Sequence, residues 1–166
     1  MESKSGKETD FFDISVETMP PHEREDYINK KLRRFINKAY QNAPAVRQKM
    51  DKAGVSPSEI RTVKDLEKIP ITRKDEFTEL QRANLPFGGF LAVPIESVGR
   101  IFVSPGPIYE VSNYLPKDLE CFYAAGFRRG DRIMNTISHH LIPGGFSIDS
   151  ALVDLGATVV PTGVDN

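Results

Sequence analysis

The stretch Arg132-Ile133-Met134-Asn135-Thr136-Ile137 decides the fold class, together with two segments that follow it. Its apolar and β-branched residues predict a strand. Residues 146–155 place apolar side chains on one helical face and end before Gly156, which is typical of a helix with a glycine cap. Residues 158–160, Thr-Val-Val, predict a second short strand. A strand, a helix and a strand in this order predict a crossover connection and two parallel strands.

The same alternation extends toward the N-terminus. Residues 101–103 predict a strand, and a helix signal begins near Pro116, with the helix expected over residues 117–125. The predicted fold class is therefore α/β, with a helical N-terminal segment followed by an incomplete, mainly parallel βαβ sheet. Only three or four strands are predicted, whereas a parallel sheet normally has more strands and helices on both faces. We therefore expect the remainder of a longer protein, a partner subunit or self-association to complete the sheet.

The helical segment is expected over residues 21–98, between a flexible N-terminus (1–20) and an incomplete α/β subdomain (99–166). Pro21 suits the first turn of a helix, and an amphipathic stripe follows it. The stripe consists of Ile28, Leu32, Phe35, Ile36 and Ala39. The other face is basic, which is typical of a solvated surface and less often of a binding patch.

Helix stop and start signals divide the rest of this segment. Gly54 is expected to end a short helix over residues 45–53. Residues 85–90 (LPFGGF) predict a turn-rich connector that packs over the core. Two capping-box pairs predict helix starts, namely Thr62 with Asp65 and Thr72 with Asp75.

The composition limits the kinds of partner. The 166 residues carry a formal net charge of −1, which gives no support for a nucleic-acid partner. No apolar run is long enough to span a bilayer, and the polar first ten residues lack a signal core, so we expect no membrane association and a cytoplasmic location. The single cysteine, Cys121, excludes an intrachain disulfide and a cysteine-based metal site. It lies in a helical pattern and is expected to be buried.

A loop is expected after the strand of residues 101–103, with the sequence Ser104-Pro105-Gly106-Pro107-Ile108-Tyr109-Glu110. A loop between a strand and a helix is the usual place for a bound phosphate. Phosphate binding needs backbone N–H groups and usually a cation, but prolines lack the N–H and a glutamate repels the anion. Tyr109 and Glu110 are expected either to pack in the loop or to recognise a polar ligand.

Five segments carry a family resemblance. They are Ala53-Gly54-Val55 with residues 63–75 (VKDLEKIPITRKD), residues 85–94 (LPFGGFLAVP), residues 125–131 (AGFRRGD), residues 139–145 (HHLIPGG) and residues 155–161 (LGATVVP). In this order they resemble the N-terminal part of phenylacetate–CoA ligases, in the adenylate-forming (AMP-binding) superfamily. The resemblance implies ATP, Mg²⁺ and CoA as cofactors and an aryl or acyl carboxylate as substrate.

The resemblance also identifies the loop at residues 104–110 as the family's phosphate loop, whose sequence is Ser-Ser-Gly-Thr-Thr-Gly-Lys-Pro. Ser104 and Gly106 match that sequence. Tyr109 replaces its second glycine, and Glu110 replaces its lysine, which reverses the charge. The family's adenine-contacting and ribose-contacting motifs and its lysine-bearing C-terminal domain correspond to nothing in these 166 residues.

A second group of candidate residues follows the strand of residues 132–137. The resemblance places His139, His140, Ile142, Gly144, Gly145 and Phe146 in or beside the carboxylate pocket. Imidazole can hydrogen-bond a carboxylate or titrate near neutral pH. A structural role, or for Gly144 and Gly145 a turn into the helix, stays open. Adjacent side chains on extended backbone point apart, so no metal site is predicted for the two histidines. Asp131 is expected to fix the turn before its strand by bonding to backbone groups.

Two hypotheses about function follow. In the first, the chain is the N-terminal portion or a split subunit of a phenylacetate–CoA-ligase-like synthetase, with part of the carboxylate pocket and a degenerate phosphate loop. In the second, it is a non-catalytic interaction or scaffold subunit that completes its sheet with a partner. A third, binding of an acyl-CoA or aryl acid without ATP chemistry, is also retained.

Overall fold

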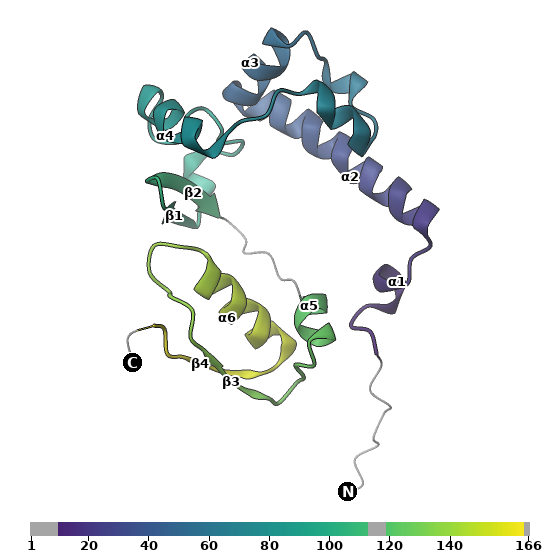
Figure 1. The fold of residues 1–166 in the computed structure, drawn as a ribbon, viewed down its shortest axis with the longest axis vertical. Helices are drawn as coiled ribbons and strands as arrows, with labels where there is room; N and C mark the ends of the chain where they lie inside the picture. The colour runs from purple at the N-terminus through teal and green to yellow at the C-terminus, as the bar shows by residue number, and fades with distance from the viewer. Residues whose placement is uncertain (1–9, 113–118, 165–166) are drawn as a thin grey trace, which may run out of the picture. The chain divides into compact units, whose positions relative to one another are not determined.

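The computed structural model describes residues 10–112 and 119–164, and Figure 1 shows the order of their helices and strands. The described residues form two compact units. The helical unit comprises residues 20–112, and the βαβ unit comprises residues 10–19 with residues 119–164. The predicted α/β class is confirmed, because each unit contains both helices and a small sheet.

The helical unit begins with the long helix α2 (Pro21–Asn42), in which Pro21 occupies the first turn as predicted. α3 (Pro44–Lys52) follows, and Gly54 with a φ of 67° lies just after its end, as the stop signal predicted. The core of the unit is formed by Ile36, Met50 and Ile60. The predicted stripe on α2 is only partly correct, because Phe35 is 67% exposed while Ile36 and Ala39 are buried.

Two 3₁₀ helices, Pro57–Glu59 and Val63–Lys68, lie between α3 and the next α-helix. The predicted capping box at the start of the second is confirmed, because the Asp65 carboxylate accepts hydrogen bonds from the backbone N–H groups of Thr62 (2.9 Å) and Arg61 (3.0 Å). The second capping prediction is wrong by one position. α4 (Lys74–Ala83) is capped by Glu76, whose carboxylate accepts from the N–H of Arg73 at 3.3 Å.

The connector of residues 85–90 packs over the core, as predicted. Phe87 is 7% exposed, and Phe90 stacks on Phe77 of α4 with ring centroids 4.6 Å apart. Gly88 (φ 64°) and Gly89 (φ 77°) hold the connector between the two helices. A Cβ atom at Gly88 would lie 3.1 Å from the carbonyl carbon of Leu80, so the connector approaches α4 more closely than most Cβ contacts do.

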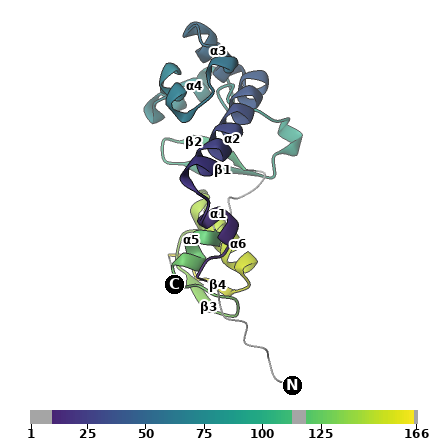
Figure 2. The same ribbon diagram turned by 90° about the vertical axis from the view of Figure 1, so that its right-hand side faces the viewer.

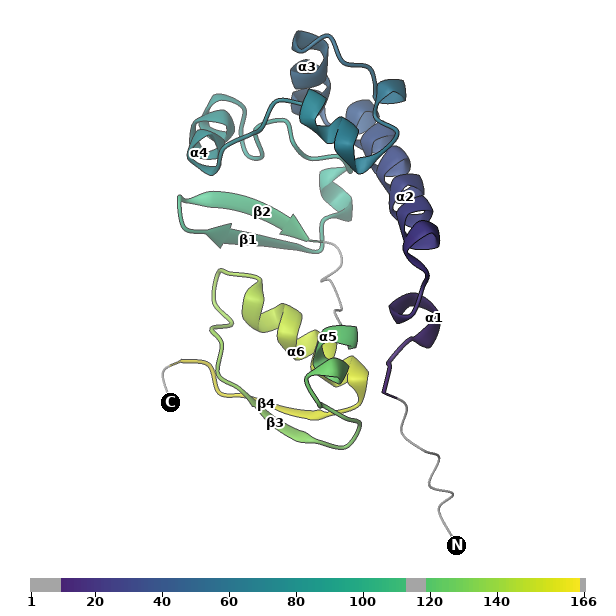
Figure 3. The same cartoon turned by 45° about the vertical axis from the view of Figure 1, so that its right-hand side comes forward.

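The loop expected over residues 104–110 is only partly correct, because a strand begins at Ile108. The helix expected over residues 117–125 is present as α5 (Leu119–Ala124). β1 (Arg100–Ser104) and β2 (Ile108–Ser112) form an antiparallel hairpin in which Ser104 is paired with Ile108. Figure 3 shows the two strands side by side near α4. The residues Ile108-Tyr109-Glu110-Val111 alternate between apolar and polar, and Ile108 is buried, which is typical of a strand. This signal was missed because the residues were assigned to a loop. The helix signal at Pro116 and residues 117 and 118 lie outside the described residues.

The βαβ unit contains the predicted crossover. β3 (Arg132–Asn135) and β4 (Thr158–Pro161) are parallel, with Ile133 paired with Val159, and α6 (Gly144–Leu155) connects them (Figure 2). Gly156 ends α6 with a φ of 93°, as predicted. The expectation that residues 101–103 join this sheet is wrong, since within the described residues each sheet has two strands.

Two further helices belong to the βαβ unit. α1 (Ile14–Glu17) lies within the segment expected to be flexible, where the Asp13 carboxylate caps it by accepting from the N–H of Ser15 at 3.0 Å. α5 (Leu119–Ala124) carries Cys121, which is exposed, so the prediction of a buried thiol is wrong. Tyr123 and not Cys121 packs inward from α5, with its ring 5.8 Å from that of Phe12. No described helix has the length and apolarity that a bilayer crossing requires.

The turn geometry at Gly88 generates the first testable prediction. Gly88→Ala should lower the free energy of unfolding by about 2–4 kcal/mol, because it combines a left-handed backbone with a clash against α4. Gly54→Ala is the matched control, since Gly54 has a φ of 67° but no atom within 4 Å of a built Cβ. It should cost about 1–2 kcal/mol, which is the backbone strain alone. Urea unfolding measures both, and equal losses would contradict the close approach.

A second prediction concerns acid stability. The Lys68 ammonium, together with the N–H groups of Thr62 and Arg61, holds the pKa of the Asp65 carboxyl well below its usual range. A folded-state pKa below the unfolded value means stability that is present above about pH 4 and lost as the pH falls further. The unfolding free energy should therefore decline below about pH 4, and Asp65→Asn should flatten that decline. Glu67→Gln in the same 3₁₀ helix is the control, and an unchanged pH profile in Asp65→Asn would contradict the assignment.

Candidate functional site

The candidate residues lie in two places, one in each unit, and are described separately. Ser104, Gly106, Tyr109 and Glu110 lie on the hairpin of the helical unit. His139, His140, Ile142, Gly144, Gly145 and Phe146 lie between β3 and the first turn of α6 in the βαβ unit.

The hairpin turn itself consists of residues 105–107. Two of these three residues are prolines, so only Gly106 carries a backbone N–H. A Cβ at Gly106 would lie 2.7 Å from the Ile108 side chain, so the turn folds back tightly on the buried start of β2. The turn therefore offers one N–H donor where a phosphate cradle needs several.

Glu110 is a strand residue and not a loop residue. It lies in β2, where its carboxylate accepts a hydrogen bond from the hydroxyl of Ser104, at the end of β1. Two of the four residues that the family resemblance placed in the phosphate loop, Ser104 and Glu110, are therefore bonded to each other. A carboxylate at this position repels an anion, and it occupies the hydroxyl that a phosphate would need.

The hairpin is fixed to α4 by Gln81, which the sequence analysis did not identify. The Gln81 side chain is 3% exposed, and its amide pairs with the backbone of Tyr109 in both directions. Nε2 donates to the Tyr109 carbonyl at 2.8 Å, and Oε1 accepts from the Tyr109 N–H at 2.9 Å. On the side of β2 that faces away from β1, the Gln81 amide thus supplies the two backbone hydrogen bonds that a neighbouring strand would otherwise make.

A shallow cavity of about 550 Å³ lies between α4 and the hairpin turn. It is lined by Lys74, Asp75, Thr78, Glu79, Arg82, Pro105, Gly106 and Ile108. Arg82 bonds Glu79 at 2.7 Å, so one of the two cations in this cavity is already paired. Thr78 donates to the Gly106 carbonyl at 3.4 Å. The mixed charge of this lining makes it a poor anion site.

In the βαβ unit, His139 lies edge-on to Phe146, with ring centroids 5.4 Å apart. Its Nε2 lies 3.4 Å from Nδ2 of Asn135 and 4.0 Å from Oδ1 of Asp149. A neutral imidazole can accept from the Asn135 amide at this nitrogen, whereas an imidazolium can pair with Asp149. His140 is exposed, and its backbone N–H donates to the hydroxyl of Ser138 at 3.2 Å.

The two glycines at the start of α6 have different surroundings. A Cβ at Gly145 would lie 2.3 Å from the Ser138 carbonyl oxygen, so Gly145 permits a close approach of two backbone segments. Gly144 has open space apart from Ile137 at 3.7 Å, so a ligand can approach the backbone there. Ile142 is 36% exposed.

Asn135 and Asp149 are two further members of this cluster that the sequence analysis missed. Asn135 is 3% exposed, and its Nδ2 also donates to the Gly145 carbonyl at 3.0 Å. It lies two residues after Ile133 on the strand, so its inward orientation was available from the period of two. Asp149 lies three residues after Phe146, on the neighbouring part of the helix surface. No group of three potential metal ligands occurs among the residues that the structure describes.

Asp131 has the role that was predicted for it. Its carboxylate accepts a hydrogen bond from the backbone N–H of Arg128 at 2.7 Å, which closes the turn before β3. The turn is also joined to the end of α6, because the N–H of Gly130 donates to the Gly156 carbonyl at 3.0 Å.

The fold is that of part of an adenylate-forming CoA ligase. A solved structure of 2-hydroxyisobutyryl-CoA ligase in the postadenylation state superposes with a TM-score of 0.88 at 24% identity, covering 96% of this chain and 35% of that one. A second structure of this ligase, with 2-HIB-AMP and CoA in the thioesterification state, gives 0.87 at 23% identity over 97% and 36% of the two chains. No protein-family model matches the chain.

Sequence comparison finds relatives among the phenylacetate–CoA ligases. The phenylacetate–coenzyme A ligases of Thermus thermophilus and Escherichia coli are each 34% identical over 156 residues, which is 88% of this chain. The chain is thus a homologue of the phenylacetate–CoA ligases. It spans about a third of their length, 34% of the first and 35% of the second.

The Gln81 amide leads to a third prediction. Gln81→Met keeps the side-chain length but leaves the Tyr109 N–H and carbonyl without their partners, so the unfolding free energy should fall by about 2 kcal/mol. The Tyr109 amide proton should also exchange faster with solvent. Gln41→Met on the exposed side of α2 is the matched control and should change the free energy by less than about 0.5 kcal/mol. An unchanged Tyr109 exchange rate in Gln81→Met would contradict the assigned pairing.

Proposed function

We propose that the chain is the N-terminal portion, or a split subunit, of a phenylacetate–CoA-ligase-like acyl- or aryl-CoA synthetase. The observation that carries this proposal is 34% identity over 88% of the chain, against about a third of each relative. The likeness to the fold of a ligase whose structures hold an acyl-adenylate supports it. The remainder of the synthetase is the partner that the proposal requires.

In this proposal the βαβ unit contributes part of the carboxylate pocket. His139, Ile142 and Phe146 form its wall, and the open space at Gly144 lets the backbone meet the acid. Asn135 holds the His139 ring from one side and the Gly145 carbonyl from the other, so it positions the wall without touching the substrate. The His139 imidazole can hydrogen-bond the carboxylate of an aryl or acyl acid, and the Phe146 ring beside it can contact the apolar part.

The hairpin does not fit a nucleoside triphosphate. It offers one N–H in the turn, and the Ser104 hydroxyl is bonded to Glu110. We therefore assign ATP, Mg²⁺ and CoA to the complete synthetase and derive no adenylation step from the residues of this chain. In this proposal the hairpin occupies the position of the family's phosphate loop but has lost the groups that bind phosphate.

A non-catalytic scaffold subunit is the second candidate. The observation that favours it is the exposed apolar surface of the sheet formed by β3 and β4, where Met134 is 67% and Val160 48% exposed. Such a surface favours completion of the sheet by a partner or by a second copy. The reversed charge at Glu110 is consistent with loss of catalysis.

A chimera tests both candidates and supplies the fourth prediction. This chain would replace the matching third of the Escherichia coli phenylacetate–CoA ligase, with folding checked by circular dichroism. The chimera should bind phenylacetate but release pyrophosphate from ATP at least 100-fold more slowly than the parent enzyme, because the loop cation is lost. Restoring the loop by Tyr109→Gly with Glu110→Lys should recover at least tenfold.

Three outcomes are informative. Recovery in the restored loop supports the ligase portion with a degenerate loop. A folded chimera that binds phenylacetate and is not improved by the restored loop favours the scaffold. A folded chimera that binds no phenylacetate contradicts the ligase proposal.

A further inference from the structure

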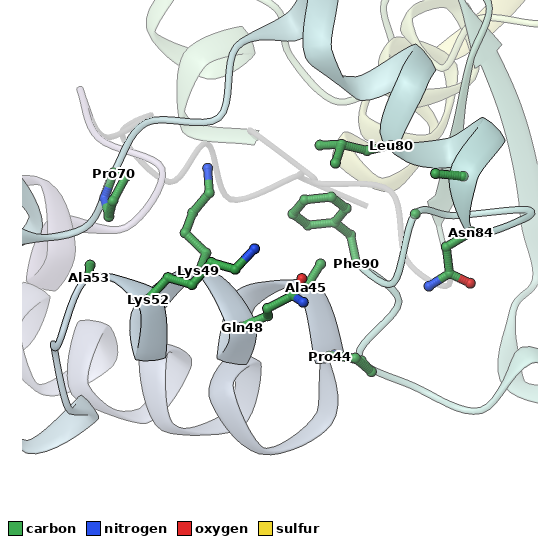
Figure 4. Close-up of a pocket in the computed structure, with 12 residues that line it drawn as sticks. Pro44, Ala45, Gln48, Lys49, Lys52, Ala53, Pro70, Leu80, Asn84 and Phe90 are labelled. Carbon is green, nitrogen blue, oxygen red and sulfur yellow. The ribbon is translucent and has the colours of Figure 1, made fainter.

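The helical unit contains a cavity of about 670 Å³ that is separate from both candidate groups (Figure 4). It lies between α3, α4 and the connector of residues 85–90. Its lining consists of Pro44, Ala45, Gln48, Lys49, Lys52, Ala53, Pro70, Leu80, Ala83, Asn84, Gly88 and Phe90. The volume falls within the range of small-molecule sites, which is about 300–1,000 Å³.

The charged side chains that line this cavity are all positive. Lys49 and Lys52 both line it, and no carboxylate does. Asp51, the acid between them in the sequence, accepts a hydrogen bond from the Tyr40 hydroxyl at 2.7 Å and is not part of the lining. The chain as a whole is nearly neutral, so two cations without an acid are a local feature of the cavity.

Both ammonium groups have donors available for a ligand. The Lys49 ammonium donates to the Thr72 hydroxyl, which leaves two of its three N–H bonds. The Lys52 ammonium has no hydrogen-bond or ion-pair partner in the part of the chain that the structure describes. An anion entering the cavity therefore meets two cations whose bonding capacity is not used up.

The rest of the lining is mainly apolar and is held in place. Figure 4 shows the Phe90 ring with Leu80 on one side and the α3 residues on the other. The stack on Phe77 fixes Phe90, and the Ala45 N–H donates to the Gly89 carbonyl at 3.0 Å, which ties the connector to α3. The apolar surface is thus preformed, and a ligand does not have to order it.

We propose that this cavity binds an organic carboxylate with a flat apolar body. The carboxylate lies against Lys49 and Lys52, and the body lies against Phe90 and Leu80. The site is distinct from the residues at 139–146 and does not depend on ATP or CoA, so it goes beyond the proposed function.

The fifth prediction is a titration of the ¹⁵N-labelled chain with 2-naphthoate, followed by nuclear magnetic resonance. The amides of Lys49, Lys52, Gly88 and Phe90 should shift and saturate. The neutral analogue 2-naphthalenemethanol should bind at least fivefold more weakly, because it lacks the charge that the lysines recognise. Absence of saturable shifts, equal binding of the neutral analogue, or shifts confined to residues 139–146 would each overturn the proposal.

Variants separate the roles of charge and space. Lys52→Gln should weaken 2-naphthoate binding about fivefold, whereas Lys38→Gln on the exposed side of α2 should leave it unchanged. Ala83→Trp fills the cavity with both lysines retained and should abolish binding. Thermal unfolding checks that each variant is folded, since a cation in the last turn of α3 also stabilises that helix. Unchanged binding in Lys52→Gln together with Ala83→Trp would overturn the proposal.

Discussion

The arrangement of the helical unit depends on the approach of the Gly88-Gly89 turn to the end of α4. At Gly88 a Cβ would come within 3.1 Å of the α4 backbone, and at Gly89 within 3.1 Å of the Asn84 amide and 3.3 Å of the Ala45 nitrogen. Both residues have a positive φ, so glycine is required for the backbone conformation as well as for the space. The turn thereby fixes the distance between α3 and α4. Because Gln81 of α4 holds β2 through Tyr109, the position of the hairpin depends on the same turn.

Sequence patterns predicted those parts of the fold in which local signals agree. The crossover from β3 through α6 to β4 combined strand composition, helical periodicity and a glycine cap at Gly156, and the structure has it. The start of the 3₁₀ helix at Val63 was predicted because a capping box needs only residues three positions apart. The hairpin was not predicted, because the two prolines and Gly106 concealed the strand that begins at Ile108. Turn residues mark a reversal of the chain, but the element after the reversal depends on the partner strand.

The candidate sites were predictable to a smaller extent. The residues at 139–146 do lie together at the start of α6, since a short loop between a strand and its helix keeps them close. Asn135, Asp149 and Gln81 were missed because their importance comes from contacts across 4, 10 and 28 positions of the chain. Buried polar side chains of this kind satisfy backbone groups, and only the fold shows which groups need them. Cys121 was expected inside for its residue type, whereas the neighbouring aromatic residues of α5 make the inward contacts.

The lining charges distinguish two cavities of the helical unit as sites for an anion. Beside the hairpin turn, Asp75 and Glu79 line the cavity with Lys74 and Arg82, and Arg82 is already bonded to Glu79. Glu110, on the neighbouring strand, adds a further carboxylate, which is bonded to Ser104. The cavity between α3 and α4 has two lysines and no acid. Opposite charges at about 4 Å near a protein surface attract by a few kcal/mol, and a carboxylate beside the cation cancels most of that gain. An anion therefore favours the cavity between α3 and α4 over the cavity beside the hairpin turn, although the family resemblance directs attention to the hairpin.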